Sequence, residues 1–262
     1  MSINIEKSVG LGAINQPGDV ISVKKRLIEL GFDWLTPDAV MGPIAIKAIL
    51  LFQAIKNGLN RVGDVRNDGR VDVGGDTLKW LQASNAPRWQ QMPAGSRAEG
   101  FVNDNISDIS DTHDFGASWL AETIRDAGAS YRDDFLAGHS HAALLTVNDT
   151  SLPRGGDTPI HATHESGLAC DIRLPRKNGA VGGITVASAD YDRAAMRAML
   201  KAFLSQTMAS RVLLSDRALV SEGLCRAAQA ISTTRTSRSD LPRAAEPGCR
   251  RWVRGRGGRI FY

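Results

Sequence analysis

The sequence predicts an α+β protein built from two parts. Three short helical patterns occupy residues 1–83, whereas residues 110–228 alternate helical and strand-like patterns. In the second part, a strand, a loop rich in metal-ligand side chains, a strand, a helix and a strand follow one another, which favours helices packed on a mainly antiparallel sheet. Residues 84–109 contain several prolines and glycines and are expected to be a linker.

Length and composition are those of a folded chain without a membrane span. Its 262 residues, 42% of them hydrophobic, suffice for two modest cores. No run of about 18 apolar residues occurs, and the N-terminus lacks a signal-peptide pattern. Three cysteines, Cys170, Cys225 and Cys249, do not form a disulfide framework. We therefore expect synthesis in the cytoplasm, without a signal peptide.

The net charge of +4 is concentrated at the C-terminus. Residues 226–262 contain nine arginines, no lysine and two acids, which leaves 23 basic and 26 acidic residues in the rest of the chain. A basic tail can bind nucleic acid, but this tail is the only feature that favours such a partner. No nucleic-acid partner is therefore expected.

The first part shows helical spacing three times. Its first helix begins near Asp19 and stops at Gly31, and its second ends near Gly58. A turn-rich stretch, residues 67–72, leads to a third, shorter helix. The apolar residues predicted to face the core are Val20, Val23, Leu27, Leu30, Ala45, Ala48, Ile49, Phe52, Ile55, Leu78 and Leu81.

These helices carry signatures spaced along residues 8–83. They read Val23-x-x-x-Leu27-x-x-Leu30-Gly31-Phe32, then Asp38-x-x-Met41-Gly42-Pro43, then Ala48-x-x-x-Phe52-Gln53. This pattern resembles the peptidoglycan-binding domain attached to many cell-wall hydrolases, which implies that bacterial peptidoglycan is a partner. The loop before Gly42 is longer than in that family, and residues 59–76 are an insertion. The alternative is a three-helix bundle whose apolar stripes form only a core.

The second part is predicted from four segments. A helix should run from Phe115 to about Ala127, and a strand from Ala142 to Val147. An amphipathic helix should span 191–204, and a strand should follow over 211–214.

The residues with the clearest chemistry lie in the stretch 161–171. It reads His-Ala-Thr-His-Glu-Ser-Gly-Leu-Ala-Cys-Asp and contains two imidazoles and a carboxylate, which are ordinary zinc ligands. The gap from His164 to Asp171 is too long for one helix face. It suits a loop that turns at Gly167 and enters a strand at Asp171. The alternative is a histidine-rich surface loop.

The pattern His-x-x-His-x-x-Gly-x-x-x-Asp-Ile resembles the first metal motif of the penicillin-insensitive murein endopeptidases. These are zinc peptidases of the group that includes D-Ala-D-Ala carboxypeptidases and lysostaphin-like enzymes. The flanks Asn148-Asp149, 153–156, 211–213 and 222–225 extend the resemblance over about residues 140–228. It implies that His164 and Asp171 bind Zn²⁺ and that His161 is a catalytic residue.

The resemblance implies a zinc metallopeptidase that cleaves D-Ala-containing peptide cross-links of the bacterial cell wall. Zinc would activate a water molecule, and His161 would stabilise the oxyanion. One alternative is a D,D-carboxypeptidase, and another is a non-catalytic wall-binding protein with a vestigial peptidase site. Without a signal peptide, the protein must reach the wall by another route, as phage lysis enzymes do.

The chain departs from the family where the third zinc ligand is due. The family supplies that ligand in a late Gly-His-Asp-Asp-His-x-His-like stretch, but no histidine follows His164 here. Read one base earlier, codons for residues 229–237 can encode Gly-His-Leu-Asp-Asp-Ala-His-Ile, with the ligand at Thr236 and an acid at Thr234. Residues 229–262 are therefore expected to be an out-of-frame or disordered basic tail. The alternative is a genuine tail on a degenerate domain.

No metal-binding or catalytic role is predicted for the remaining histidines or for Cys170. His139 and His141 match no ligand position of the family and are expected to be polar strand-end residues. His113 lies among acids at a helix start, and no role is predicted for it. Cys170 is expected to be a small buried residue, not a nucleophile.

Overall fold

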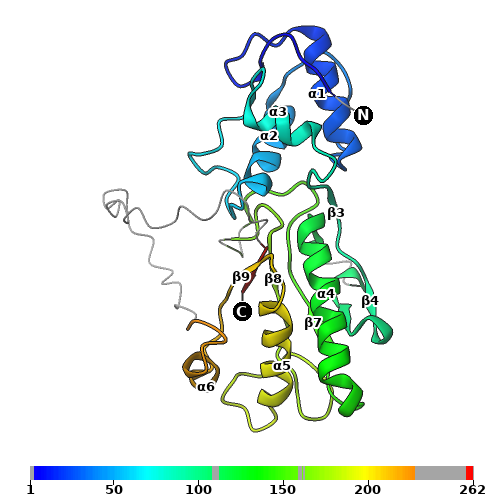
Figure 1. The fold of residues 1–262 in the computed structure, drawn as a ribbon, viewed down its shortest axis with the longest axis vertical. Helices are drawn as coiled ribbons and strands as arrows, with labels where there is room; N and C mark the ends of the chain where they lie inside the picture. The colour runs from blue at the N-terminus through cyan, green and yellow to red at the C-terminus, as the bar shows by residue number, and fades with distance from the viewer. Residues whose placement is uncertain (1–2, 108–111, 159–160, 162, 228–257, 262) are drawn as a thin grey trace, which may run out of the picture.

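The computed structural model describes residues 3–107, 112–158, 161, 163–227 and 258–261. Over these residues the fold is mixed α/β, with six α-helices and several small sheets. Figure 1 shows the first three helices at one end of the long axis and α5 and α6 toward the other. None of the described helices is both long and apolar enough to cross a membrane.

The N-terminal part, residues 3–83, contains three helices at the predicted places. They are α1 (Pro17–Glu29), α2 (Pro43–Lys56) and α3 (Asp76–Gln82). Both α1 and α2 begin with proline, whose fixed φ and missing N–H suit the first helical turn. A short antiparallel pair, β1 (Val9–Gly10) with β2 (Arg70–Val71), closes the bundle. The predicted core residues are all buried.

The Phe52-Gln53 pair has a structural explanation. Phe52 is fully buried in the helical core, and Gln53 is buried beside it. The Gln53 amide makes four hydrogen bonds: its nitrogen donates to Asp68 Oδ1 (2.7 Å), Arg70 O (2.9 Å) and Thr77 Oγ1 (3.0 Å), and its oxygen accepts from Gly69 N (2.9 Å). One side chain thereby ties α2 to the β2 turn and to α3.

Residues 84–109, expected as a linker, instead contribute structure to the C-terminal part. They form β3 (Trp89–Gln91), β4 (Gly95–Ser96) and β5 (Phe101–Asn103). The glycines and prolines separate these strands. Gly100, for example, has φ +81°, and a Cβ there would overlap the carbonyl oxygen of Gly128 in α4. Strands of two or three residues leave too little alternation to be recognised in the sequence.

The C-terminal part, residues 84–227 with 258–261, packs its longest helices against each other. These are α4 (Ser118–Asp134) and α5 (Arg193–Leu204). The predicted helix start at Phe115 is corrected by three residues, because Phe115–Ala117 form β6, which pairs with β3. Helix α4 also runs to Asp134, beyond the expected end at Ala127. The remaining elements are β7 (Leu145–Val147), β8 (Ala169–Asp171), β9 (Ala209–Val212), α6 (Arg217–Ser221) and β10 (Gly258–Phe261).

The sheets of the C-terminal part mix both strand directions. Strand β5 pairs antiparallel with β4 and parallel with β7, and a single antiparallel bridge, Val147 to Ile172, places β7 beside β8. Strand β10 lies between β8 and β9 and is parallel to both. Across all described residues of both parts, antiparallel pairing still predominates, because β1–β2, β3–β6, β4–β5 and four of the five isolated bridges are antiparallel.

The two parts share a packed core around Trp89. The helical core of the N-terminal part includes Trp89, Trp119 and Leu168 from the C-terminal part. Trp89 N donates to Leu30 O at 2.7 Å, and its indole nitrogen donates to Pro153 O at 2.8 Å. Its two hydrogen bonds therefore join α1 to the chain that leads to the candidate site.

Candidate metal centre

The described residues between β7 and β8, which are 148–158, 161 and 163–168, are named here the metal loop. Together with the end of β8 it brings His161, His164 and Asp171 into one cluster, whose candidate ligand atoms all lie within 4.8 Å of one another. His164 Nε2 is 3.5 Å from Asp171 Oδ1, and His161 Nδ1 is 3.7 Å from Asp171 Oδ2. Zinc binds such atoms at about 2 Å, so ligands of one ion lie roughly 3 to 4 Å apart. The cluster therefore fits a single metal ion.

One side of the cluster is buried in the protein, and the other side is exposed to solvent. His164 is 1% exposed, whereas 24% of the Asp171 side chain and 15% of the His161 side chain remain accessible. Asp171 is held by its backbone, since its N–H donates to Asp149 O and its carbonyl accepts from Asn148 N, both at 2.8 Å. It ends β8, whereas the sequence placed it at a strand start, because pairing begins two residues earlier.

The turn predicted at Gly167 is confirmed. Gly167 has φ +60°, and a Cβ there would overlap the Cα of Gly116 and lie 2.8 Å from the ring of Trp89. Only glycine fits this backbone and this space. The close approach fixes the path of the metal loop between His164 and Asp171.

Asp149 is an acidic neighbour of the cluster. Its Oδ2 lies 2.6 Å from His161 Nε2. Burial would raise the pKa of Asp149, but the hydrogen bond from His161 and the charges of His161, His113 and His164 outweigh burial and hold that pKa below its usual value. An ionised carboxylate only accepts hydrogen bonds, so His161 Nε2 carries a proton. In neutral His161 the lone pair then lies on Nδ1, the atom that faces Asp171.

His113 also lies at the site, although the sequence predicted no role for it. Its ring centroid is 5.5 Å from that of His161, and its Nε2 is 3.2 Å from Thr158 Oγ1. Thr150 holds it there, because both the N–H and the hydroxyl of Thr150 donate to His113 O. Neither His113 nor Asp149 belongs to the motif 161–171. Only the flanking Asn-Asp pair at the end of a strand pointed toward Asp149.

The other sequence candidates lie elsewhere. His139 and His141 are exposed, and the ring of His139 stacks on Phe135 at 4.1 Å. Cys170 is fully buried, and burial raises the pKa of its thiol. Thr234 and Thr236, where a shifted reading frame would supply further site residues, lie outside the described residues.

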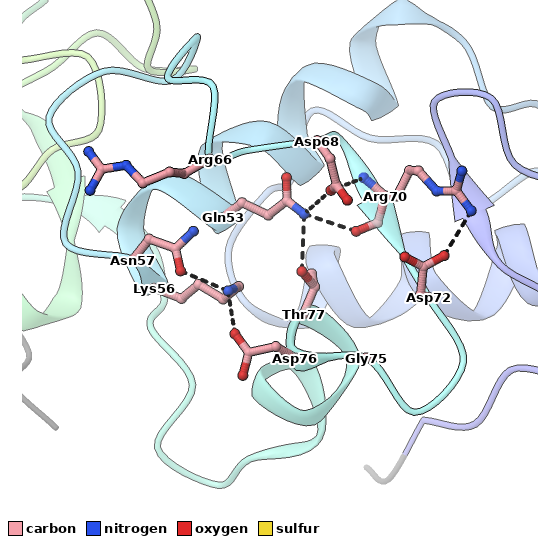
Figure 2. Close-up of a pocket in the computed structure, with 10 residues that line it drawn as sticks. All are labelled: Gln53, Lys56, Asn57, Arg66, Asp68, Arg70, Asp72, Gly75, Asp76 and Thr77. Atoms are coloured by element: carbon pink, nitrogen blue, oxygen red, sulfur yellow. Dashed lines mark hydrogen bonds and ion pairs between the residues drawn. The ribbon is translucent and has the colours of Figure 1, made fainter. Parts of the chain in front are cut away.

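A hollow lies in the N-terminal part (Figure 2). It is a polar cleft of about 470 Å³, lined by Gln53, Lys56, Asn57, Arg66, Asp68, Arg70, Asp72, Gly75, Asp76 and Thr77. Two ion pairs lie within it: Lys56 Nζ is 2.6 Å from Asp76, and an Arg70 nitrogen is 2.9 Å from Asp72.

Fold and site together define a mixed α/β protein with a candidate mononuclear metal centre of two histidines and an aspartate. No family model, no curated protein and no solved structure matches the chain.

Proposed function

We propose that this protein is a zinc metallopeptidase that cleaves D-Ala-containing peptide cross-links in the bacterial cell wall. The observation that carries the proposal is the juxtaposition of His161, His164 and Asp171 at the end of β8. Imidazole and carboxylate ligands with an open solvent side are typical of catalytic zinc sites, whereas closed structural sites use four protein ligands. The motif resemblance to murein endopeptidases supplies the substrate class.

The ligand set differs from the one implied by the resemblance. We assign His161, through Nδ1, as a third protein ligand beside His164 and Asp171, instead of a separate catalytic residue. Bound zinc supplies a Lewis acid and a water molecule whose pKa falls to about 7. Asp149 orients His161 by accepting from Nε2, an arrangement that fixes ring direction in many metal sites. His113, beside the cluster, is then the group placed to move a proton.

The N-terminal part would hold the enzyme on its insoluble substrate. Cell-wall peptides carry both free amines and carboxylates, and the polar cleft beside α2 offers paired cations and acids to such groups. Binding there would raise the local concentration of the enzyme at the wall. The partner is bacterial peptidoglycan, and the place of action is the cell wall.

The second candidate is a non-catalytic wall-binding protein. It is favoured by the absence of any histidine after His164, because the family's late ligand motif is missing from the sequence. Purified peptidoglycan incubated with the protein, with zinc and with a chelator, separates the candidates. An endopeptidase converts dimeric muropeptides to monomers, and a D,D-carboxypeptidase releases terminal D-Ala. Wall binding without any zinc-dependent product would leave only the binding role.

Re-reading the gene across codons 225–241 decides the origin of the third ligand. A restored Gly-His-x-Asp-Asp-x-His would place a ligand at position 236 and return His161 to a catalytic role. A confirmed frame would leave His161 as the third ligand. Within the tail, the structure describes only β10 (Gly258–Phe261), which pairs at three positions with β8 and at two with β9, so these four residues form a strand where the sequence predicted an out-of-frame or disordered tail.

A further inference from the structure

A hydrogen bond joins the N-terminal part to the metal loop. Val62 N donates to Glu165 Oε2 at 2.9 Å. Val62 belongs to the segment that the sequence marks as an insertion, and Glu165 directly follows His164. We infer that residues 57–67, named here the anchor loop, position the metal loop, with Glu165 as the positioning residue. This inference rests on the proposed zinc site and adds to it the element that holds it in place.

The anchor loop is itself firmly held. Asn67 is buried, and its amide nitrogen donates to Val62 O at 3.1 Å. Its amide oxygen accepts from Asn57 Nδ2 at 3.2 Å, and Asn57 caps the end of α2. The side chain of Val62 packs on the helical core. A continuous set of contacts therefore runs from α2 through Asn67 and Val62 to Glu165.

Two further contacts fix the metal loop on the N-terminal part. Gly155 has φ +61° and lies so close to Leu51 of α2 that a Cβ would come within 2.8 Å of the leucine Cδ2. Gly156 N donates to Glu165 O at 2.8 Å, and this bond links the part of the metal loop before His161 to the part after it. Leu168 is fully buried in the helical core. Glu165 therefore contacts both the anchor loop and the early part of the metal loop.

Glu165 acts through its neighbour and not on the ion. Its carboxylate accepts a hydrogen bond from Val62 N. Glu165 directly follows His164 in the chain, and His164 is almost completely buried. Groups that orient metal ligands typically contribute roughly 10- to 100-fold to metal affinity. If the N-terminal part were only a tether to the wall, removal of this contact would leave metal binding unchanged.

The test compares variants of the full-length protein. Glu165→Ala removes the acceptor, Glu165→Gln retains an acceptor oxygen, and Val65→Ala is a matched control in the same loop, because Val65 is 98% exposed. The zinc dissociation constant is measured by competition with a chromophoric chelator. Amide hydrogen exchange of residues 163–171 is measured without metal. We expect Glu165→Ala to weaken zinc binding roughly 10- to 100-fold and to speed exchange, while Glu165→Gln and Val65→Ala stay close to wild type.

Unchanged zinc affinity and unchanged exchange in Glu165→Ala would overturn the inference, as would a loss of stability alone. If the wild-type protein bound no zinc, the proposed function would fail, and the exchange comparison alone would decide for or against the positioning role. If Glu165→Ala did not fold, Glu165→Asp, one methylene shorter, would test the same contact by the same two measurements.

Discussion

Asp149 holds Nε2 of His161 at 2.6 Å and so directs Nδ1 of the same ring toward Asp171. This relationship places the proton of neutral His161 on Nε2 and turns Nδ1 toward Asp171. It also explains how a chain without a late histidine offers three ligand atoms at one point.

Asp149→Asn should weaken zinc binding. The amide would no longer provide an ionised acceptor for His161 Nε2, so the ring would be less firmly oriented, and we expect a roughly 10- to 100-fold rise in the zinc dissociation constant. Chelator competition measures it. The control is Asp133→Asn, at an exposed acid that pairs with Arg132 in α4. Equal affinities for both variants would contradict the orienting role.

His161→Ala should abolish stoichiometric zinc binding, because only two protein ligands would remain in the cluster. Metal content after dialysis against buffered zinc, measured by mass spectrometry, checks this. His139→Ala is the control, since that side chain is exposed and stacks on Phe135. A His161→Ala protein that retained one tightly bound zinc would show that another residue completes the site.

Gly167→Ala should destabilise the protein more than Gly58→Ala does. Both glycines have positive φ, +60° and +65°, where alanine costs about 1–2 kcal/mol. At Gly58 a Cβ meets nothing within 4 Å, whereas at Gly167 it would overlap Gly116 and Trp89. Overpacking adds about 1–3 kcal/mol. Urea denaturation of both variants measures the difference, and equal losses would count against the tight packing at Gly167.

Asp216→Asn should lower stability at neutral pH. Burial would raise the pKa of Asp216, but hydrogen bonds from Arg193 (2.7 Å) and from the N–H groups of Ala218 and Leu219 outweigh burial and hold that pKa below its usual value. Because the folded-state pKa is lowered, the stabilisation is present above about pH 4 and disappears as pH falls through the folded-state pKa. We expect a loss of about 1–3 kcal/mol at pH 7.

Urea denaturation of wild type and Asp216→Asn at several pH values checks the linkage. The gap between the two proteins should narrow as the pH falls below about 4. Glu99→Gln serves as the control for charge removal, because Glu99 is exposed and its carboxylate accepts from Ser96 Oγ. A gap that stayed constant down to low pH would show that ionisation of Asp216 does not stabilise the fold.

The N-terminal helices were predictable because their signals are local. Apolar spacing, proline at the first turn and glycine at the ends fix α1 and α2 without reference to the rest of the chain. The short strands β3 to β5 were not predictable, because pairing with distant partners, and not alternation, creates them. Their prolines and glycines are equally typical of a linker.

The candidate site was predictable in part for the same reason. His161, His164 and Asp171 lie in one motif, so the sequence alone brings them together. Asp149 and His113 approach only through tertiary contacts: the first by the bridge between β7 and β8, the second by the bonds from Thr150. No spacing rule connects residues that meet in this way.

The position of Trp89 bears on how the two parts of the protein evolved and how they unfold. It begins the first strand of the C-terminal part, yet its ring belongs to the core of the N-terminal helices. A recombination event that exchanged those helices for another module would leave Trp89 and Leu168 without their apolar cover. This shared core therefore favours evolution of the two parts as one unit. It also favours unfolding of both parts in a single cooperative transition.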